Sequence, residues 1–174
     1  EASNRGHGAS ILFIPEGHQD CLKFIDIKYK ISDILSIHRL LDECSDAEWN
    51  NESSVLGYKK YISERLKFVS QLTCMDGALL LTNSLQVVSF GAHLNAPDWK
   101  GKVLIAPDGF GGGGGDFHAK GYGTRHNSVI SFIGAVEDCF GFVISEDGPI
   151  RGFIKKDHDT IYCWPDCAVS MFMD

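Results

Sequence analysis

Apolar residues recur along the chain with two different periods, one typical of strands and one typical of helices. Short apolar runs bounded by turn residues predict the strands 10–14, 77–81, 85–90, 103–105, 140–144 and 150–154. The second and third of these strands are expected to form a hairpin around residues 82–84. The last two are expected to form a second hairpin around residues 146–149.

Three other segments repeat their apolar residues every three or four positions, which predicts helices. The first begins at Ser32, a typical N-cap residue, and residues 44–54 after it are polar and predict a surface connection. The third should run from about Arg125 to Val136. The expected inward-facing residues are Ile34, Ile37, Leu40 and Leu41, then Val55, Tyr58, Ile62, Leu66 and Val69, then Val129, Phe132, Ile133 and Val136. Helices and strands in this order predict one α/β domain over residues 1–174, with a mixed twisted sheet flanked by helices.

The composition restricts the classes of function. The 174 residues are 44% apolar and 22% charged, as in a globular domain. A net charge of −7 argues against a nucleic-acid surface but is compatible with a small anionic ligand. We expect no membrane span or signal peptide, because no apolar run approaches ~20 residues. Six scattered cysteines predict a reduced, cytoplasmic protein, and a start at Glu1 predicts further sequence upstream.

The strongest chemical signal is Gly-Tyr-Gly-Thr-Arg-His-Asn-Ser at residues 121–128. The glycines permit a close backbone approach, and Thr124 stands where a helix N-cap is expected. The N–H groups of a first helical turn attract anions, and Arg125 and His126 add donors for a phosphate. On spacing alone, an ordinary capped helix with solvated Arg and His is the alternative.

Two further polar clusters lie next to predicted strands. Asp76, followed by Gly77 and Ala78, is placed to approach a ribose hydroxyl or to hold a divalent cation. A plain turn explains this tripeptide more simply. Ser145 and Glu146 follow a strand, where they form either a hairpin turn or a polar cluster facing a ligand and its metal.

Other motifs carry less weight. Cys163 and Cys167, with His158 nearby, lack the spacing and the second ligand pair of a zinc site, so we predict no structural metal. The glycine-rich segment 108–115 is not a phosphate-binding Walker loop, because no Gly-Lys-Ser/Thr follows it. The chain also lacks a G-x-S-x-G nucleophile motif.

Taken in order, the three clusters resemble the diadenylate cyclase family, whose hallmarks are Asp-Gly-Ala and Gly-Thr-Arg-His-Arg. Residues 8–14 also resemble the opening strand of that family, so the resemblance extends over about residues 6–155. It implies a mixed sheet with ATP bound at its edge. In the enzymes of the family, two domains face each other and convert two ATP to cyclic di-AMP and pyrophosphate with Mg²⁺ or Mn²⁺. The resemblance therefore also implies a homodimer or higher oligomer.

The resemblance implies roles for particular residues. Asp76 would be the catalytic residue, close to the metal and to the attacking 3′-hydroxyl, and Glu146 would also lie near the metal. The nucleotide-binding residues would be Gly77, Ala78, Gly123, Thr124, Arg125, His126, Asn127, Ser145 and Glu146.

Several positions depart from the family pattern. Asn127 replaces its second arginine, and losing one charged donor costs about 2–4 kcal/mol of transition-state stabilisation unless Lys120 substitutes for it. Met75 stands where many cyclases carry His. Residues 6–8 and 145–148 resemble instead a branch of the fold (DACNV-type domains) thought to sense nucleotide signals in bacterial conflict systems. The sequence thus leaves three functions open: a nucleotide sensor, an active cyclase, or a structural domain with a vestigial pocket.

Overall fold

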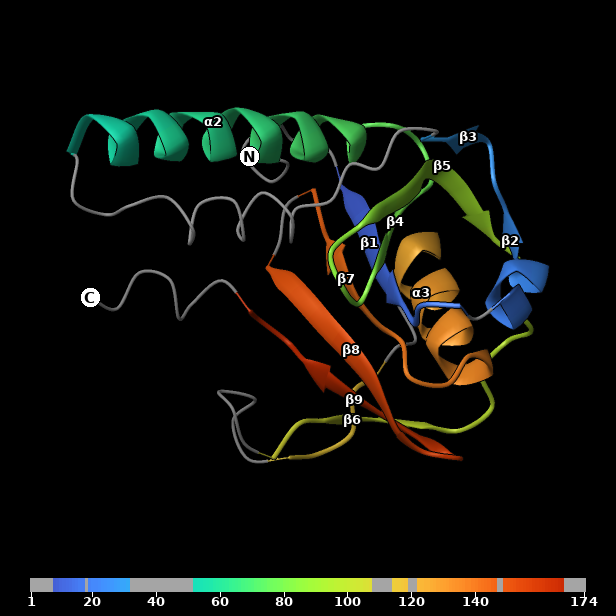
Figure 1. Ribbon diagram of the computed structural model, residues 1–174. Coiled ribbons are helices and arrows are strands. Elements are labelled where there is room, and N and C mark those ends of the chain that lie inside the picture. Colours follow the sequence, from blue (N-terminus) through green and yellow to red (C-terminus); the bar gives the residue numbers. More distant parts are fainter. Residues whose placement is uncertain are drawn as a thin grey trace.

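The computed structural model describes residues 8–17, 19–31, 52–107, 114–118, 122–146 and 149–167. They form a mixed sheet flanked by helices, as predicted (Figure 1). The strands are β1 (Ala9–Ile14), β2 (Ile25–Asp26), β3 (Tyr29–Lys30), β4 (Ala78–Thr82), β5 (Val87–Leu94), β6 (Lys102–Ile105), β7 (Phe140–Ile144), β8 (Ile150–Asp157) and β9 (Thr160–Trp164). The helices are α2 (Glu52–Leu72), α3 (Thr124–Ala135) and the short 3-10 helix η2 (Gln19–Phe24).

The nine-stranded sheet has the order β2-β5-β4-β1-β7-β8-β9-β6, and β3 also pairs with β5. The pairs β1–β4 and β6–β9 are parallel, whereas the other pairs are antiparallel. Strand β1 therefore lies between a parallel and an antiparallel neighbour in the middle of the sheet. This arrangement brings the start of β1 and β4 to the same edge as the end of β7.

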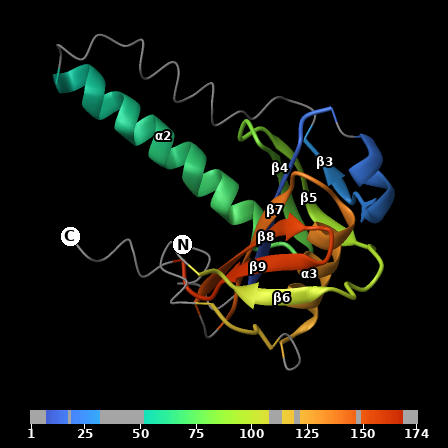
Figure 2. The ribbon, with the colours of Figure 1, turned by 90° about the horizontal axis from the view of Figure 1, so that it is seen from below.

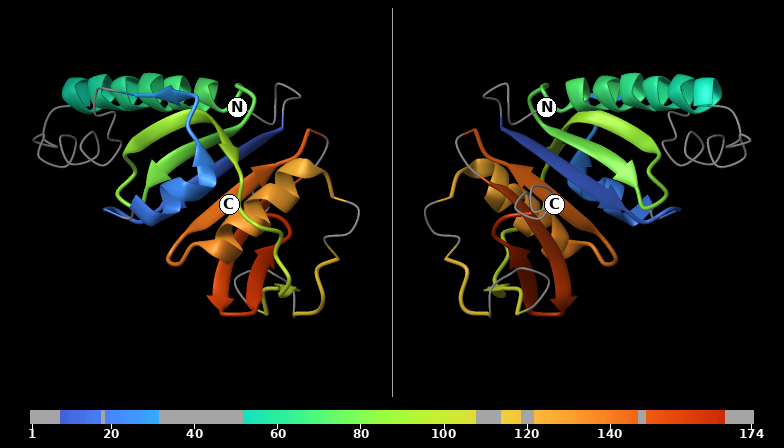
Figure 3. Two further views of the ribbon diagram at one scale, coloured as in Figure 1. Left: turned by 90° about the vertical axis from the view of Figure 1, so that its right-hand side faces the viewer. Right: turned by 90° about the vertical axis from the view of Figure 1, so that its left-hand side faces the viewer.

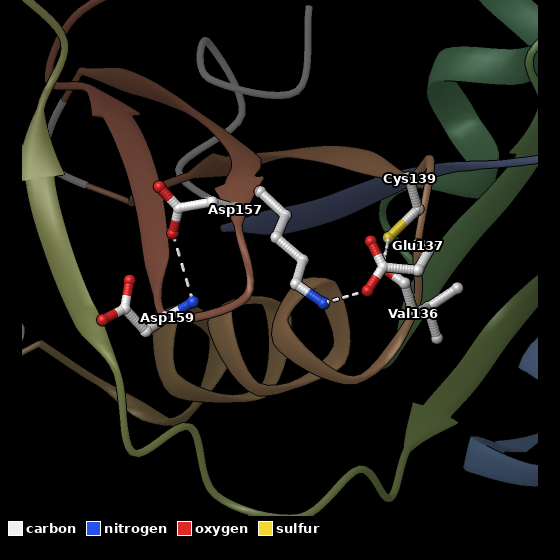
Figure 4. Close-up of polar contacts among 6 residues, drawn as sticks. Val136, Glu137, Cys139, Asp157 and Asp159 are labelled. Atoms are coloured by element: carbon white, nitrogen blue, oxygen red, sulfur yellow. Dashed lines mark hydrogen bonds and ion pairs between the residues drawn. The ribbon is translucent and has the colours of Figure 1, made fainter.

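Both predicted hairpins are confirmed, as β4–β5 and β7–β8. Strands β5 and β8 continue beyond their predicted ends, to Leu94 and Asp157, and β9 was not predicted. The turn between β8 and β9 is closed by the Asp159 N–H, which donates to the Asp157 carboxylate at 3.2 Å (Figure 4). The predicted helix at 32–41, residues 44–51 of the predicted connection at 44–54, and most of the glycine segment, 108–113, lie outside the described residues. The connection is wrong at residues 52–54, which already belong to α2.

The two faces of the sheet carry separate hydrophobic clusters, because successive side chains of a strand point to opposite faces. Helix α3 lies against β7 and β8 on one face (Figure 3), and the four inward-facing residues predicted for it are all buried. The larger cluster, under α3, includes Leu12, Leu80, Val129, Phe132, Val143 and Phe153. The smaller cluster, under the end of α2, includes Val69, Leu79, Leu81 and Val87.

The apolar face predicted for α2 is wrong at Leu66. This helix is about 30 Å long, and it projects beyond the sheet with only its last turns against it (Figure 2). Val69 is accordingly 8% exposed, whereas Leu66 is 46% exposed. The side chains of Val55 and Tyr58 lie outside the described part of the chain. In that part, no helix is both long and apolar enough to cross a membrane.

A row of buried residues that we call the core row crosses five strands beneath α3. Strand pairing aligns Leu80, Leu12, Gly141, Phe153 and Cys163. Gly141 leaves space that its neighbours fill, because a Cβ there would lie 2.7 Å from Leu12 Cδ2 and 3.2 Å from Val129 Cγ1. Beyond the helix, the ammonium of Lys155 donates to the Glu137 carboxylate and joins β8 to the turn that follows α3 (Figure 4).

We predict that Gly141→Ala lowers the free energy of unfolding by about 1–3 kcal/mol, because the added methyl overpacks the contact between α3 and the sheet. Gly57→Ala in α2 is the matched control. A Cβ at this exposed helical position meets no atom within 4 Å. It should therefore raise the free energy of unfolding by about 0.5–1 kcal/mol. Urea unfolding followed by circular dichroism measures both, and equal effects would contradict the close approach at Gly141.

Candidate functional site

A second row of residues, which we call the cavity row, lies next to the core row. Strand pairing aligns Ala92, Ala78, Ser10, Val143 and Arg151 across β5, β4, β1, β7 and β8. Neighbours in register point to the same face of a sheet, which here is the face covered by α3. All five residues line a cavity of about 930 Å³. Three of them are small, so the row leaves space above the sheet.

The three clusters of the sequence analysis meet in this cavity. Its lining includes Asp76, Gly77, Ala78, Gly123, Thr124, Arg125, His126, Ser145 and Glu146. Asn127 is the one predicted site residue that the cavity does not include, and it is exposed on α3. The structure thus brings the predicted residues together, while the ligand that each one contacts remains a prediction.

The turn at Asp76 depends on the glycine that follows it. Gly77 has φ of 110°, and a Cβ there would lie 2.5 Å from the carbonyl carbon of Gly91 on β5. Only glycine fits this conformation and this close approach. The turn interpretation of the tripeptide is therefore correct, and the same turn places Asp76 in the lining of the cavity.

Helix α3 begins one residue earlier than expected, so Thr124 is its first residue and not its N-cap. The N-cap is Gly123, and no side chain caps the helix. Backbone bonds from the His126 and Asn127 N–H groups to the Gly123 carbonyl, at 3.1 and 3.4 Å, satisfy two donors. The N–H groups of Thr124 and Arg125 have no acceptor among the described residues. Such donors at the positive end of the helix dipole favour an anion.

Arg125 forms an ion pair with Glu146 at 3.3 Å, between Nη1 and Oε1. The two side chains are 44% and 54% exposed. A pair this exposed contributes about 1 kcal/mol or less. Arg125 can therefore exchange Glu146 for a ligand at little cost.

Arg151 is a second cation of the cavity, which the sequence analysis missed. Its Nη1 donates to Ser145 Oγ at 3.0 Å and lies 3.3 Å from His126 Nε2. Its guanidinium lies over the ring of Tyr122, 4.7 Å from the centroid. One signal could have identified it: Arg151 shares a strand face with Phe153, and arginine on the buried face of a strand is unusual.

His126 is neutral in the folded protein. It is 6% exposed, and its ring lies 4.8 Å from that of Tyr122. Burial, and then the charge of Arg151, lower the pKa of His126 to about 4. At neutral pH its Nε2 thus accepts a hydrogen bond from Arg151, and its proton is on Nδ1. His126 therefore positions Arg151 and carries no positive charge, and its predicted role as a donor to phosphate stays a prediction.

Asp76 and Glu146 supply the carboxylate oxygens that Mg²⁺ and Mn²⁺ prefer, and both line the cavity. One or two carboxylates suit Mg²⁺, whose other ligands are commonly water and phosphate oxygens. Within the described ranges, three potential ligand atoms come together elsewhere, at the exposed turn of Asp157, His158 and Asp159. That turn is not part of the cavity lining.

Two cysteines, Cys163 and Cys139, are fully buried in the core. Burial raises the pKa of the Cys163 thiol to about 12, and it raises that of Cys139 to about 12 as well. Both thiols are therefore protonated at neutral pH and pack as small apolar groups.

Comparison with known proteins finds a likeness only among solved structures. No protein-family model matches the sequence, and no curated protein matches it. A similar solved structure is the crystal structure of DacA from Staphylococcus aureus, in a double cysteine mutant form. The match covers 98% of this chain and 82% of DacA, with 17% identity and a TM-score of 0.47. A likeness at this level carries no argument about function, which must come from the cavity.

We predict that the protein loses stability between about pH 6.5 and pH 4 because of His126. In this window the unfolded chain takes up a proton on His126 and the folded chain does not, so the unfolded state binds more protons. The contribution is fully present above pH 6.5 and is lost as the pH falls to about 4. It amounts to about 3 kcal/mol at most.

Urea unfolding of the wild type and of His126→Gln, at several pH values across this window, measures the effect. The difference between their free energies of unfolding should shrink as the pH falls. His118→Gln, at an exposed position, should keep the wild-type pH dependence. Parallel curves for the wild type and His126→Gln would contradict a neutral, buried His126.

Proposed function

We propose that this cavity binds an adenine nucleotide or a cyclic dinucleotide. The observation that carries the proposal is the uncapped N-terminus of α3, which shares the cavity with Arg125 and Arg151. Backbone N–H groups beside arginine forks are typical phosphate-binding groups. The volume of about 930 Å³ is near the upper end of roughly 300–1,000 Å³ for small-molecule sites, so a nucleotide with its phosphates can be accommodated.

The remaining lining groups support the same ligand. Asp76 can accept hydrogen bonds from ribose hydroxyls, and Ser145 can donate to a phosphate oxygen. The preference for adenine rests on the resemblance of residues 76–78 and 123–126 to the motifs of diadenylate cyclases. If a divalent cation accompanies the nucleotide, Asp76 and Glu146 would hold it, and it would neutralise phosphate charge.

We further propose that the chain senses the nucleotide and does not convert it, in a bacterial signalling or defence system. Asn127 brings no charge and is exposed outside the cavity lining. Residues 6–8 and 145–148 resemble the sensor branch. The residue that could compensate for Asn127, Lys120, lies outside the described residues. A cytoplasmic location and self-association belong to the same proposal.

One observation favours the alternative, an active diadenylate cyclase. Arg151 brings into the cavity a positive charge of the kind that Asn127 lacks. Phosphoryl transfer depends mainly on such charges and on positioning. The alternative also requires two cavities to face each other, so that each ribose hydroxyl reaches the neighbouring ATP.

We predict that ATP or cyclic di-AMP binds, and that Arg125→Ala weakens binding about 10- to 100-fold through loss of a charge-assisted hydrogen bond. Isothermal titration calorimetry with Mg²⁺ measures the dissociation constants. Arg65→Ala is the matched control, because Arg65 is an exposed arginine of α2 whose guanidinium contacts Tyr61. Absence of binding by the wild type at millimolar nucleotide would refute the proposed function.

We also predict little or no cyclic di-AMP when the wild type is incubated with ATP and either Mg²⁺ or Mn²⁺. Chromatography of the products, with Asn127→Arg assayed in parallel, tests this. A gain in product with Asn127→Arg would identify the missing charge as the obstacle. Rapid turnover by the wild type that the substitution does not improve would instead establish the cyclase.

A further inference from the structure

Within the described part of the chain, Arg151 carries its charge in the cavity without a carboxylate beside it. Among the described residues, the carboxylates of the cavity do not come within ion-pair distance of Arg151, and Glu146 pairs with Arg125. The partners of Arg151 are uncharged: the Ser145 hydroxyl and the neutral His126. A charge withdrawn from water without an opposite charge lowers stability. This arrangement therefore points to an anion that is bound there.

The surroundings of Arg151 hold it in one orientation. Nη1 carries two hydrogens, which match its two acceptors, Ser145 Oγ and His126 Nε2. Tyr122 lies against the guanidinium and also stacks on Phe117, with ring centroids 4.9 Å apart. Both hydrogen bonds of Arg151 found in the described part of the chain come from Nη1. The other terminal nitrogen, Nη2, is therefore available to a ligand. Nε is not, because it is buried, and it lacks a hydrogen-bond partner among the described residues.

The two arginines of the cavity differ in their readiness for an anion. Arg125 is about half exposed, and its charge is already partly compensated by the ion pair with Glu146. Arg151 gives up nothing, because its partners are neutral and contact only one of its nitrogens. It also extends from β8 in the cavity row, next to Val143 in register. A preorganised cation loses less entropy on binding than a mobile one at the rim.

We infer that Arg151 is the principal phosphate-binding residue of the cavity, and that His126, Ser145 and Tyr122 position it. The inference rests on the proposed nucleotide binding and specifies which group holds the phosphate. Arg125 and the α3 N-terminus contribute secondary contacts to the same anion. Tyr122, already engaged by Phe117 and Arg151, orients the guanidinium and does not stack on the base.

The test measures binding of three probes separately: ATP, adenosine and inorganic tripolyphosphate. In calorimetry, Arg151→Met should weaken ATP and tripolyphosphate about 30- to 100-fold, and more than Arg125→Met does. Adenosine affinity should stay unchanged, which distinguishes a lost phosphate contact from a distorted cavity. Arg151→Lys keeps the charge but loses the fork, so it should fall between the wild type and Arg151→Met. Arg65→Met should match the wild type for all probes.

The outcomes separate this inference from the proposed function. If ATP binds and Arg151→Met and Arg151→Lys change its affinity by less than about threefold, the inference is overturned and nucleotide binding stands. If tripolyphosphate binds through Arg151, and neither adenosine nor ATP binds more tightly than tripolyphosphate, the adenine assignment fails and the inference stands. Absence of all binding by the wild type overturns both. Circular dichroism confirms that the variants are folded, and Arg151→Lys supplies the result if Arg151→Met is not.

Discussion

The contact between α3 and the sheet at Gly141 determines where the other parts of the cavity lie. Val129 and Leu12 occupy the space that a side chain at position 141 would need, so the helix packs directly on the core row. The cavity row lies two residues further along each strand, about 7 Å away. Because α3 begins above that row, its uncapped N-terminus faces the cavity. A wider gap at Gly141 would move these N–H groups away from Arg151 and Ser145.

The two rows also differ in packing, because the cavity row is filled less completely than the core row. Strands β4 and β1 each contribute a leucine to the core row and a small residue to the cavity row, Leu80 with Ala78 and Leu12 with Ser10. Filling the cavity row with leucine would bury more apolar area, worth about 1.5–3 kcal/mol for each side chain. Ala78, Ser10 and Ala92 do not provide this stability, and the cavity lies above them. Lower stability at a ligand site is typical of proteins.

Structural features that depend on local sequence patterns could be predicted from the sequence. Features that depend on which strands are neighbours in the sheet could not. Short apolar runs identified β1, β4 and β7, and the apolar stripe of α3 identified its buried face. The cavity charge escaped prediction because assigning Arg151 to a strand does not reveal that it lies in register with Val143 and, one strand further, with Ser10. The pattern of α2 was misleading at Leu66, because periodicity shows that a helix has an apolar face but not how much of the helix the sheet covers.

The location of positive charge bears on whether the cavity holds a nucleotide or also transforms it. On the proposed function, Arg151 would hold a phosphate of the bound nucleotide from the strand floor, before any reaction as well as during it. Uniform binding of this kind tightens a complex without lowering the barrier to chemistry. Catalysis would need an additional charge where two bound nucleotides meet, and Asn127, exposed on α3 outside the cavity lining, does not bring one. On the proposed function, this distribution of charge fits a binding module better than a transferase.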